Sequence, residues 1–259
     1  MKLFLRQVRS LVKLSFLELW RRNDVFALLL LGLALMVPLS MATPFGADGA
    51  SRYLDEVALL LVWGFSLFIA LGAGQRLFPP EFESRTIYPL LAKPISRGRL
   101  LVGKYIGAVA AAWSALAFFY VLFVASVLLR GGAFAAELPQ AIALHFAFVA
   151  LAVAVSLLGS LLVTASANLS LSAIVLVGMF FFGRQLPEYA EGLNPALAWV
   201  VKAVYAVAPH AEFFDMRQRL VHGWGAVDGI VFSVVLLYAA AYAAALLGLA
   251  ALVLRRRRL

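Results

Sequence analysis

The residues best suited to chemistry lie between Glu81 and Lys104, where charged side chains separate two long apolar runs. Charged residues make up only 14% of the chain, yet this segment holds a cluster with both signs represented: Glu81, Glu83, Arg85, Lys93, Arg97, Arg99 and Lys104. Charges of both signs on a short polar segment can pair with complementary charges on another protein. The pattern predicts that the rest of the chain presents this segment to a soluble partner.

The same segment contains signals that start and stop helices. Pro89 and Pro94 limit the length of any helix that includes them. Ser84 or Thr86 can cap a short helix, and Ser96 can cap the helix that follows. We expect a short surface helix, a proline-bounded turn and then the start of a long apolar helix. A plainer interpretation of the charges is a solvated face without a partner.

Other residue types with catalytic or metal-binding capacity are scattered or absent from the sequence. The chain has no cysteine, which excludes disulfides, thiolate ligands and a cysteine nucleophile. The nucleotide-binding pattern GxxxxGK(S/T) does not occur, nor do HExxH and GxSxG. His210 and His222 share one predicted outer loop, which permits either a metal site or two histidines at the membrane surface. We expect His145 at the membrane surface rather than in a buried proton relay, because it lies near the start of a predicted span.

The composition is that of a membrane protein. Hydrophobic residues make up 64% of the 259 residues, and the mean hydropathy is +0.96, whereas a soluble domain is about 45–50% apolar. One soluble core could not bury this much apolar surface, so lipid must be the solvent for most of the chain. The net charge of +9 comes from basic residues beside the apolar runs. That placement is typical of a topology signal rather than of a nucleic-acid-binding surface.

Six apolar segments are suited to crossing a bilayer as helices. We predict an all-α membrane protein that forms a single domain over residues 1–259, with spans at about 25–41, 57–78, 100–129, 141–163, 169–186 and 229–254. A tight polar turn is expected over Thr164–Ser172, between the fourth and fifth spans. Glycines that would allow close helix approach lie in the second and third spans: Gly64, Gly72, Gly74, Gly103 and Gly107.

Three segments outside the spans have distinct patterns. Residues 1–23 place apolar side chains at helical spacing among basic ones, which favours an amphipathic helix in the membrane interface over a plain basic flank. Residues 79–99 form the polar connection between the second and third spans. Residues 187–228 form an outer loop with an apolar stretch at 195–208 that is too short to cross, so we expect a re-entrant or interfacial helix there.

The distribution of basic residues predicts the orientation. Six spans put both termini on one side, and that side holds 16 of the 22 Lys and Arg residues. The bias predicts a multi-pass protein whose termini and 79–99 connection are cytoplasmic. The predicted spans carry no charged residue near their midpoints, and such a residue is typical of ion-coupled carriers. We therefore expect a partner protein, rather than an ion gradient, to supply the energy.

The charged segment resembles a signature of type-2 ABC exporter permeases. Its sequence, EFESRTI at 81–87, LLAKPISR at 90–97 and LVGK at 101–104, is similar to the pattern that follows the second span in that family. The outer segment at 208–223 is also similar to the NosY-like branch of these permeases. With six spans and an amphipathic start, the resemblance covers the whole chain. Pro79-Pro80 departs from the continuous helix expected just before the signature.

The resemblance implies a permease that pairs with a second copy, as a homodimer, and with two ABC ATPase subunits. ATP and Mg²⁺ would bind the ATPase, so this chain would be neither an enzyme nor a cofactor-binding protein. The implied location is the cytoplasmic (inner) membrane of a bacterium or archaeon. A coupling helix at about 81–91 would sit in a groove of the ATPase, with these residues of the chain at or near the contact: Glu81, Glu83, Arg85, Thr86, Tyr88, Pro94, Arg97 and Lys104.

Three functions remain open from the sequence. The first is an ABC permease that forms the path of an exported substrate. The second is a membrane-embedded enzyme, whose polar cluster would have to come from residues 188–228. The third is a scaffold that transmits the force of ATP hydrolysis to an outside partner without transport. NosY-like permeases are associated with copper-site maturation, but the methionines here are dispersed and cysteine is absent, so the sequence does not support copper as cargo.

Overall fold

The computed structural model describes residues 2–21, 23–41, 50–79, 96–131 and 136–256, and these ranges are mostly helical. The helices are α1 (Lys2–Trp20), α2 (Asn23–Met41), α3 (Ala50–Gln75), α6 (Arg97–Leu129), α7 (Leu138–Leu162), α8 (Ala165–Phe182), α9 (Leu186–Glu191), α10 (Pro195–Val207), α11 (Arg217–His222) and α12 (Gly229–Arg256). Two 3-10 turns, η1 (Gly183–Gln185) and η2 (Ala211–Phe214), lie on either side of the α9–α10 pair.

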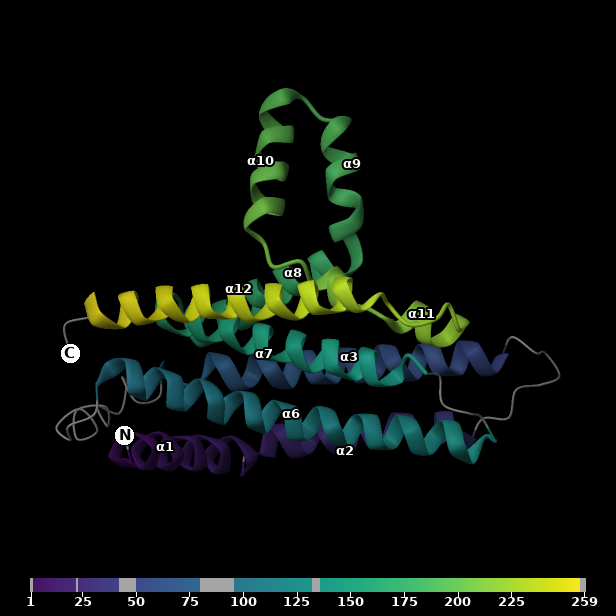
Figure 1. The fold of residues 1–259 in the computed structure, drawn as a ribbon, viewed down its shortest axis with the longest axis horizontal. Helices are drawn as coiled ribbons and strands as arrows, with labels where there is room; N and C mark the ends of the chain where they lie inside the picture. The colour runs from purple at the N-terminus through teal and green to yellow at the C-terminus, as the bar shows by residue number, and fades with distance from the viewer. Residues whose placement is uncertain (1, 22, 42–49, 80–95, 132–135, 257–259) are drawn as a thin grey trace.

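The long helices lie side by side along one axis of the molecule (Figure 1). Five of the described helices are long and apolar enough to cross a membrane. The number rises to six if α1 and α2, which meet at a bend of 56°, count as one broken span. The predicted all-α membrane fold is therefore confirmed. The starts of α1 and α6 and the end of α12 lie at one end of the bundle, called here the terminal end.

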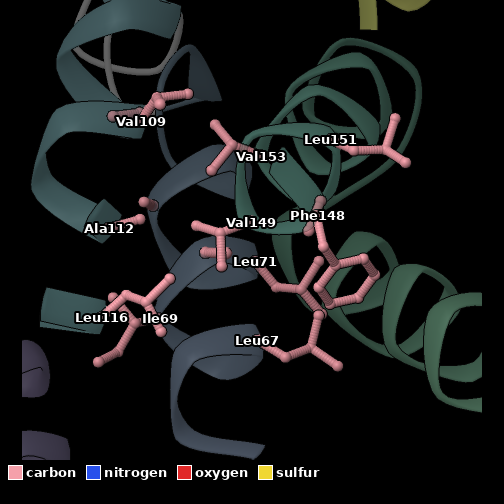
Figure 2. Packing of buried hydrophobic residues seen from close by; sticks show 14 of the residues in the cluster. Leu67, Ile69, Leu71, Val109, Ala112, Leu116, Phe148, Val149, Leu151 and Val153 are labelled. Carbon is pink, nitrogen blue, oxygen red and sulfur yellow. The ribbon is translucent and has the colours of Figure 1, made fainter. Parts of the chain in front are cut away.

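A core of apolar side chains joins α3, α6 and α7 (Figure 2). Leu71 of α3, Leu116 of α6 and Phe148 of α7 are fully buried in it. α3 and α7 approach closely at Gly74, where a Cβ atom would stand 2.7 Å from Ser156 Cβ and 2.8 Å from a backbone oxygen of α7. Only glycine fits at this distance, which confirms the predicted close approach at Gly74.

The same prediction is wrong for the two other glycines of α3. A Cβ atom at Gly64 or Gly72 would meet no described atom within 4 Å. Each of these glycines instead borders a separate cavity beside α3. The second span therefore uses one glycine for helix packing and leaves the surface open at the other two.

The amphipathic helix α1 packs along the first turns of α6. Its buried face repeats every four residues, as Leu11, Ser15 and Leu19, while the charged side chains between them are exposed. This face packs against Gly103 and Gly107 of α6. A Cβ atom at Gly103 would lie 2.8 Å from Leu11 Cβ, and one at Gly107 would lie 2.7 Å from Ser15 Cβ. The predicted contact of two small residues is confirmed, and its partner is α1.

The turn between the fourth and fifth spans is shorter than predicted. The sequence placed it at Thr164–Ser172, but α8 already begins at Ala165, so two residues connect α7 to α8. The polar side chains of this stretch lie on the helix and find partners inside the protein: Asn168 Nδ2 donates to the Ser156 backbone oxygen at 2.8 Å. Because these groups are satisfied by a neighbouring helix, they do not end the helix that carries them.

α9 and α10 form a hairpin that projects from the bundle, across the direction of the long helices (Figure 1). Asn194 caps α10, since its Oδ1 accepts a hydrogen bond from Leu197 N at 2.9 Å. α10 has 13 residues, which is about 20 Å of helix, whereas the hydrocarbon core of a bilayer is about 30 Å thick. None of its residues is buried by the described chain. Its apolar side chains must therefore face lipid or another protein.

We expect Gly107→Leu to destabilise the protein by about 1–3 kcal/mol through overpacking. The new side chain would need space now held by Ser15 and by the Val12 backbone oxygen, which lies 2.9 Å from the position of a Cβ atom. A lower Tm in detergent and faster proteolysis at Lys13 would report the displaced α1. The control is Gly98→Leu on the same helix, where a Cβ atom meets nothing within 4 Å. Equal losses in both variants would contradict the proposed contact.

Candidate functional site

Two of the residues predicted to contact a partner lie in the described part of the chain. Arg97 begins α6, and Lys104 lies about two turns further along the same helix. α3 ends at Gln75, four residues before Pro79, so the proline pair follows that helix instead of interrupting it. The remaining predicted residues fall outside the described ranges: Glu81, Glu83, Arg85, Thr86, Tyr88 and Pro94.

Arg97 ties the start of α6 to the end of α12. Its Nη1 donates to the backbone oxygens of Leu254 at 2.8 Å and Arg255 at 3.1 Å. The last carbonyls of a helix lack partners within it and carry the negative end of its dipole, so a cation is stabilised there. The predicted N-cap at Ser96 is confirmed, because its hydroxyl accepts a hydrogen bond from Arg99 N.

Lys104 makes a corresponding contact just after α3. Its side chain is only 5% exposed, its ammonium group donates to the Leu77 backbone oxygen, and it lies 5.1 Å from the centre of the Phe78 ring. A lysine is rarely buried unless its charge has partners. Here a carbonyl and an aromatic face together replace the water that it loses. α6 thereby holds the residues that follow α3.

Arg97, Lys104 and the backbone oxygens that they bind form what we call the basic frame. It joins α6 to α12 and to the chain that follows α3, at the terminal end, through contacts made by residues on both sides of 80–95. The resemblance implied that Lys104 acts at the contact with a partner. Its burial gives it a positioning role from within the bundle, whereas Arg97 is partly exposed. The frame has no catalytic arrangement, and it connects α6 with α12 and with the chain that follows α3.

Buried hydrogen bonds link α3, α7 and α8 without involving the basic frame. Ser156 Oγ donates to the Leu71 backbone oxygen at 2.8 Å. Asn168 bonds to Ser156 in turn, and Ser172 Oγ donates to Asn168 Oδ1 at 3.0 Å. This network is absent from the predictions made from the sequence. The available signal was the spacing of Asn168 and Ser172, four residues apart and thus on one face of an apolar helix.

His145 of α7 is fully buried at the centre of a second polar cluster. One ring nitrogen lies 2.8 Å from Ser66 Oγ and the other 3.0 Å from Tyr120 Oη. The ring also stacks on Trp63, with 4.2 Å between ring centroids. The expectation that His145 lies at the membrane surface is wrong, because α3 and α6 provide partners for both nitrogens and an apolar face for the ring. The cluster cross-links three helices.

The outer segment is held by ion pairs and aromatic contacts. Arg217 Nε lies 3.0 Å from Asp215 Oδ1, and the guanidinium group lies 4.6 Å from the centre of the Phe180 ring. Arg130, which follows α6, pairs with Asp55 of α3. The contact with Phe180 connects the end of α8 to the start of α11, and the Arg130 pair connects the start of α3 to the chain that follows α6.

His210 and His222 do not come together in the described chain. His210 Nδ1 lies 3.0 Å from Glu212 Oε1, and the His222 ring stacks on Trp224 with 5.3 Å between centroids. Among the described residues, no group of three His, Asp or Glu side chains is placed to hold a metal ion. Each histidine is instead used in a contact within the outer segment.

Comparison with known proteins identifies a family for most of this structure. Residues 15–184 match the family model described as ABC-2 family transporter protein. The match begins within α1, ends in η1 and covers about two thirds of the chain. It includes Arg97 and Lys104 of the basic frame. A search of curated proteins found no match.

Lys104→Met, which nearly preserves the length of the side chain, should loosen the chain after α3. The variant leaves the Leu77 backbone oxygen without its ammonium donor, and a buried group left unsatisfied costs about 1–3 kcal/mol. We expect a lower Tm and faster hydrogen–deuterium exchange over residues 75–79. Lys13→Met removes an exposed charge from α1 and should change neither. Equal effects of the two variants would show that charge, not the contact, is responsible.

Tyr120→Phe should destabilise the protein more than Tyr105→Phe, although both remove one hydroxyl between α6 and α7. Without the Tyr120 hydroxyl, one nitrogen of the buried His145 ring loses its partner, at a cost of about 1–3 kcal/mol. The Tyr105 hydroxyl donates to the Ala150 backbone oxygen at 3.1 Å, and that oxygen lies inside a helix, so its loss should cost about 0.5–1.5 kcal/mol. Thermal unfolding in detergent measures both, and the opposite ranking would refute the role given to His145.

Proposed function

Because the chain belongs to the ABC-2 family of transporter proteins, it is a permease subunit of an ABC transporter, and we propose that a separate ATPase drives it through residues 79–99. ATP and Mg²⁺ would bind that ATPase. We further propose a location in the cytoplasmic membrane of a bacterium or archaeon, with both termini cytoplasmic, and outward transport. The similarity of 208–223 to the NosY-like branch supports that subtype.

The proposal depends on one observation, which is that the basic frame anchors the chain on both sides of residues 80–95. Lys104 holds the residues that follow α3, and Arg97 holds the first turn of α6 against the end of α12. A force applied to a segment fixed at both ends moves the helices that hold it, whereas a loose connection would absorb the force. The opposite charges at Glu83 and Arg85 suit pairing with a groove on the ATPase.

The packing of the bundle supports transmission beyond the frame. α6 is pressed against α1 through Gly103 and Gly107 and shares the apolar core with α3 and α7. Close-packed side chains transmit displacement because they leave little room to absorb it. A push at the terminal end would therefore tilt this group of helices as a body. The buried clusters around Ser156 and His145 would keep the helices in register during the movement.

We also propose that two copies form the transport unit, as a homodimer. The hairpin of α9 and α10 stands off the bundle (Figure 1), and α10 exposes a run of large apolar side chains: Leu197, Trp199, Val200, Val204 and Val207. An open, apolar groove of about 400 Å³ lies between α8 and α10. A helix of a second copy could fill this groove and cover the exposed apolar side chains of α10. The hairpin of each copy would then lie across its partner.

The coupling test reverses the two charges and removes the aromatic side chain: Glu83→Lys, Arg85→Glu and Tyr88→Ala together. Exposed ion pairs contribute only about 0–1 kcal/mol each, so the single changes should be mild. A buried aromatic anchor contributes about 2 kcal/mol, so we expect the triple variant to lose roughly 30-fold or more in ATPase affinity. Co-purification with the ATPase and ATP turnover in reconstituted membranes measure the loss.

The matched control carries the same kinds of change on exposed residues of the opposite side: Arg52→Glu, Asp228→Lys and Tyr53→Ala. It should bind the ATPase as the unmodified permease does. If the coupling variant also did so, the role assigned to residues 79–99 would be wrong. ATP turnover that depends on the segment but moves no solute would favour a scaffold that transmits force without transport.

A further inference from the structure

A mostly apolar cavity of about 190 Å³ lies beside the last turns of α3, at the terminal end of the bundle. Four helices line it, with these residues prominent: Leu19, Leu28, Phe68, Gly72, Gln75 and Leu169. A Cβ atom at Gly72 would meet no described atom within 4 Å. Glycine at this position therefore leaves the surface of α3 open, in contrast to Gly74, which is required for helix packing.

Gln75 lines this cavity and carries an unsatisfied polar atom. The residue is 5% exposed, and its Oε1 has no hydrogen-bond partner in the described part of the chain. Buried polar atoms are nearly always satisfied, because an amide oxygen that loses water without gaining a donor is destabilised. A mostly apolar cavity beside this oxygen calls for a ligand that combines a hydrogen-bond donor with an apolar body.

Arg76 adds a positive charge to the same wall. A guanidinium group has five N–H donors and binds phosphate oxygens well, and it can serve more than one neighbour at a time. The cavity thus presents, side by side, a site for an anion, an acceptor for a hydroxyl donor and an apolar surface. The phosphate, the headgroup hydroxyl and an acyl chain of one lipid match these features in turn.

We infer that this cavity binds an anionic glycerophospholipid whose headgroup carries a hydroxyl, with phosphatidylglycerol as the type. Arg76 binds the phosphate, the headgroup hydroxyl donates to Gln75 Oε1, and an acyl chain lies against Phe68 and Leu28 where Gly72 leaves room. The lipid comes from the leaflet that faces the chain termini, which is the inner leaflet in the orientation proposed above. Because it touches α1, α2, α3 and α8 at once, it joins the amphipathic helix to the spans.

The test uses the full-length permease, delipidated in detergent and titrated with phosphatidylglycerol under native mass spectrometry. Gln75→Leu removes the acceptor and Gly72→Leu fills the apolar part, and each should weaken binding by about five- to a hundredfold. Gly64→Leu is the matched control, because it lies on the same helix, has open space around its Cβ atom and borders a different cavity. Its binding should equal that of the unmodified chain. Arg76→Gln should reduce the preference for phosphatidylglycerol over phosphatidylcholine.

Three results would overturn the inference. One is unchanged phosphatidylglycerol binding in Gln75→Leu. If Gly72→Leu does not fold, this result alone is enough to refute the inference. Another is equal binding of phosphatidylcholine, whose headgroup has no hydrogen-bond donor, since that would indicate unspecific lipid. The third is displacement by inorganic phosphate alone, which would indicate an anion site without lipid. Binding is measured without ATP or the ATPase, so this inference and the proposed coupling can fail independently.

Discussion

The last backbone carbonyl groups of a helix have no hydrogen-bond donor within the helix, so water or another part of the protein must supply one. This requirement is met twice at the terminal end, and both times by α6. Arg97 serves the last carbonyls of α12, and Lys104 serves a carbonyl just after α3. The same helix receives α1 through two glycines. α6 is therefore the element on which the positions of α1, of the end of α12 and of the residues after α3 depend.

The two ends of the bundle are held by different means. Cation-to-carbonyl contacts join the helices at the terminal end, whereas the ion pair of Arg130 with Asp55 joins α3 to the chain that follows α6 at the other end. Between them the core is filled by side chains such as Leu116 and Phe148 (Figure 2). A bundle fixed in this way favours tilting as a body over internal bending. With its interior occupied, a substrate path is better placed at the edge of the bundle, where a second copy would complete it.

The sequence predicts the helical framework well, because its signals are local. Ser96 is an N-cap by residue type and position, and Gly103 with Gly107 forms a small-residue pair that any close neighbour could use. Roles that depend on a distant partner are not predictable in this way. His145 is polar in an apolar helix, but its burial follows from Ser66 and Tyr120, which are far away in the sequence. Similarly, the sequence predicts that Lys104 is a surface charge, because nothing local indicates that it binds the Leu77 backbone oxygen.

In the proposed orientation, the burial of Lys104 would also link the permease to the membrane potential. A unit charge that crosses a whole membrane changes its free energy by about 2.3 kcal/mol per 100 mV. The Lys104 side chain does not extend into water, because its ammonium group is hydrogen-bonded to the Leu77 backbone oxygen after α3. In the orientation proposed above, with the termini cytoplasmic, an interior-negative potential would draw this charge inward and resist any outward tilt of α6. The resting position of the helices should therefore be held partly by the voltage of the cell.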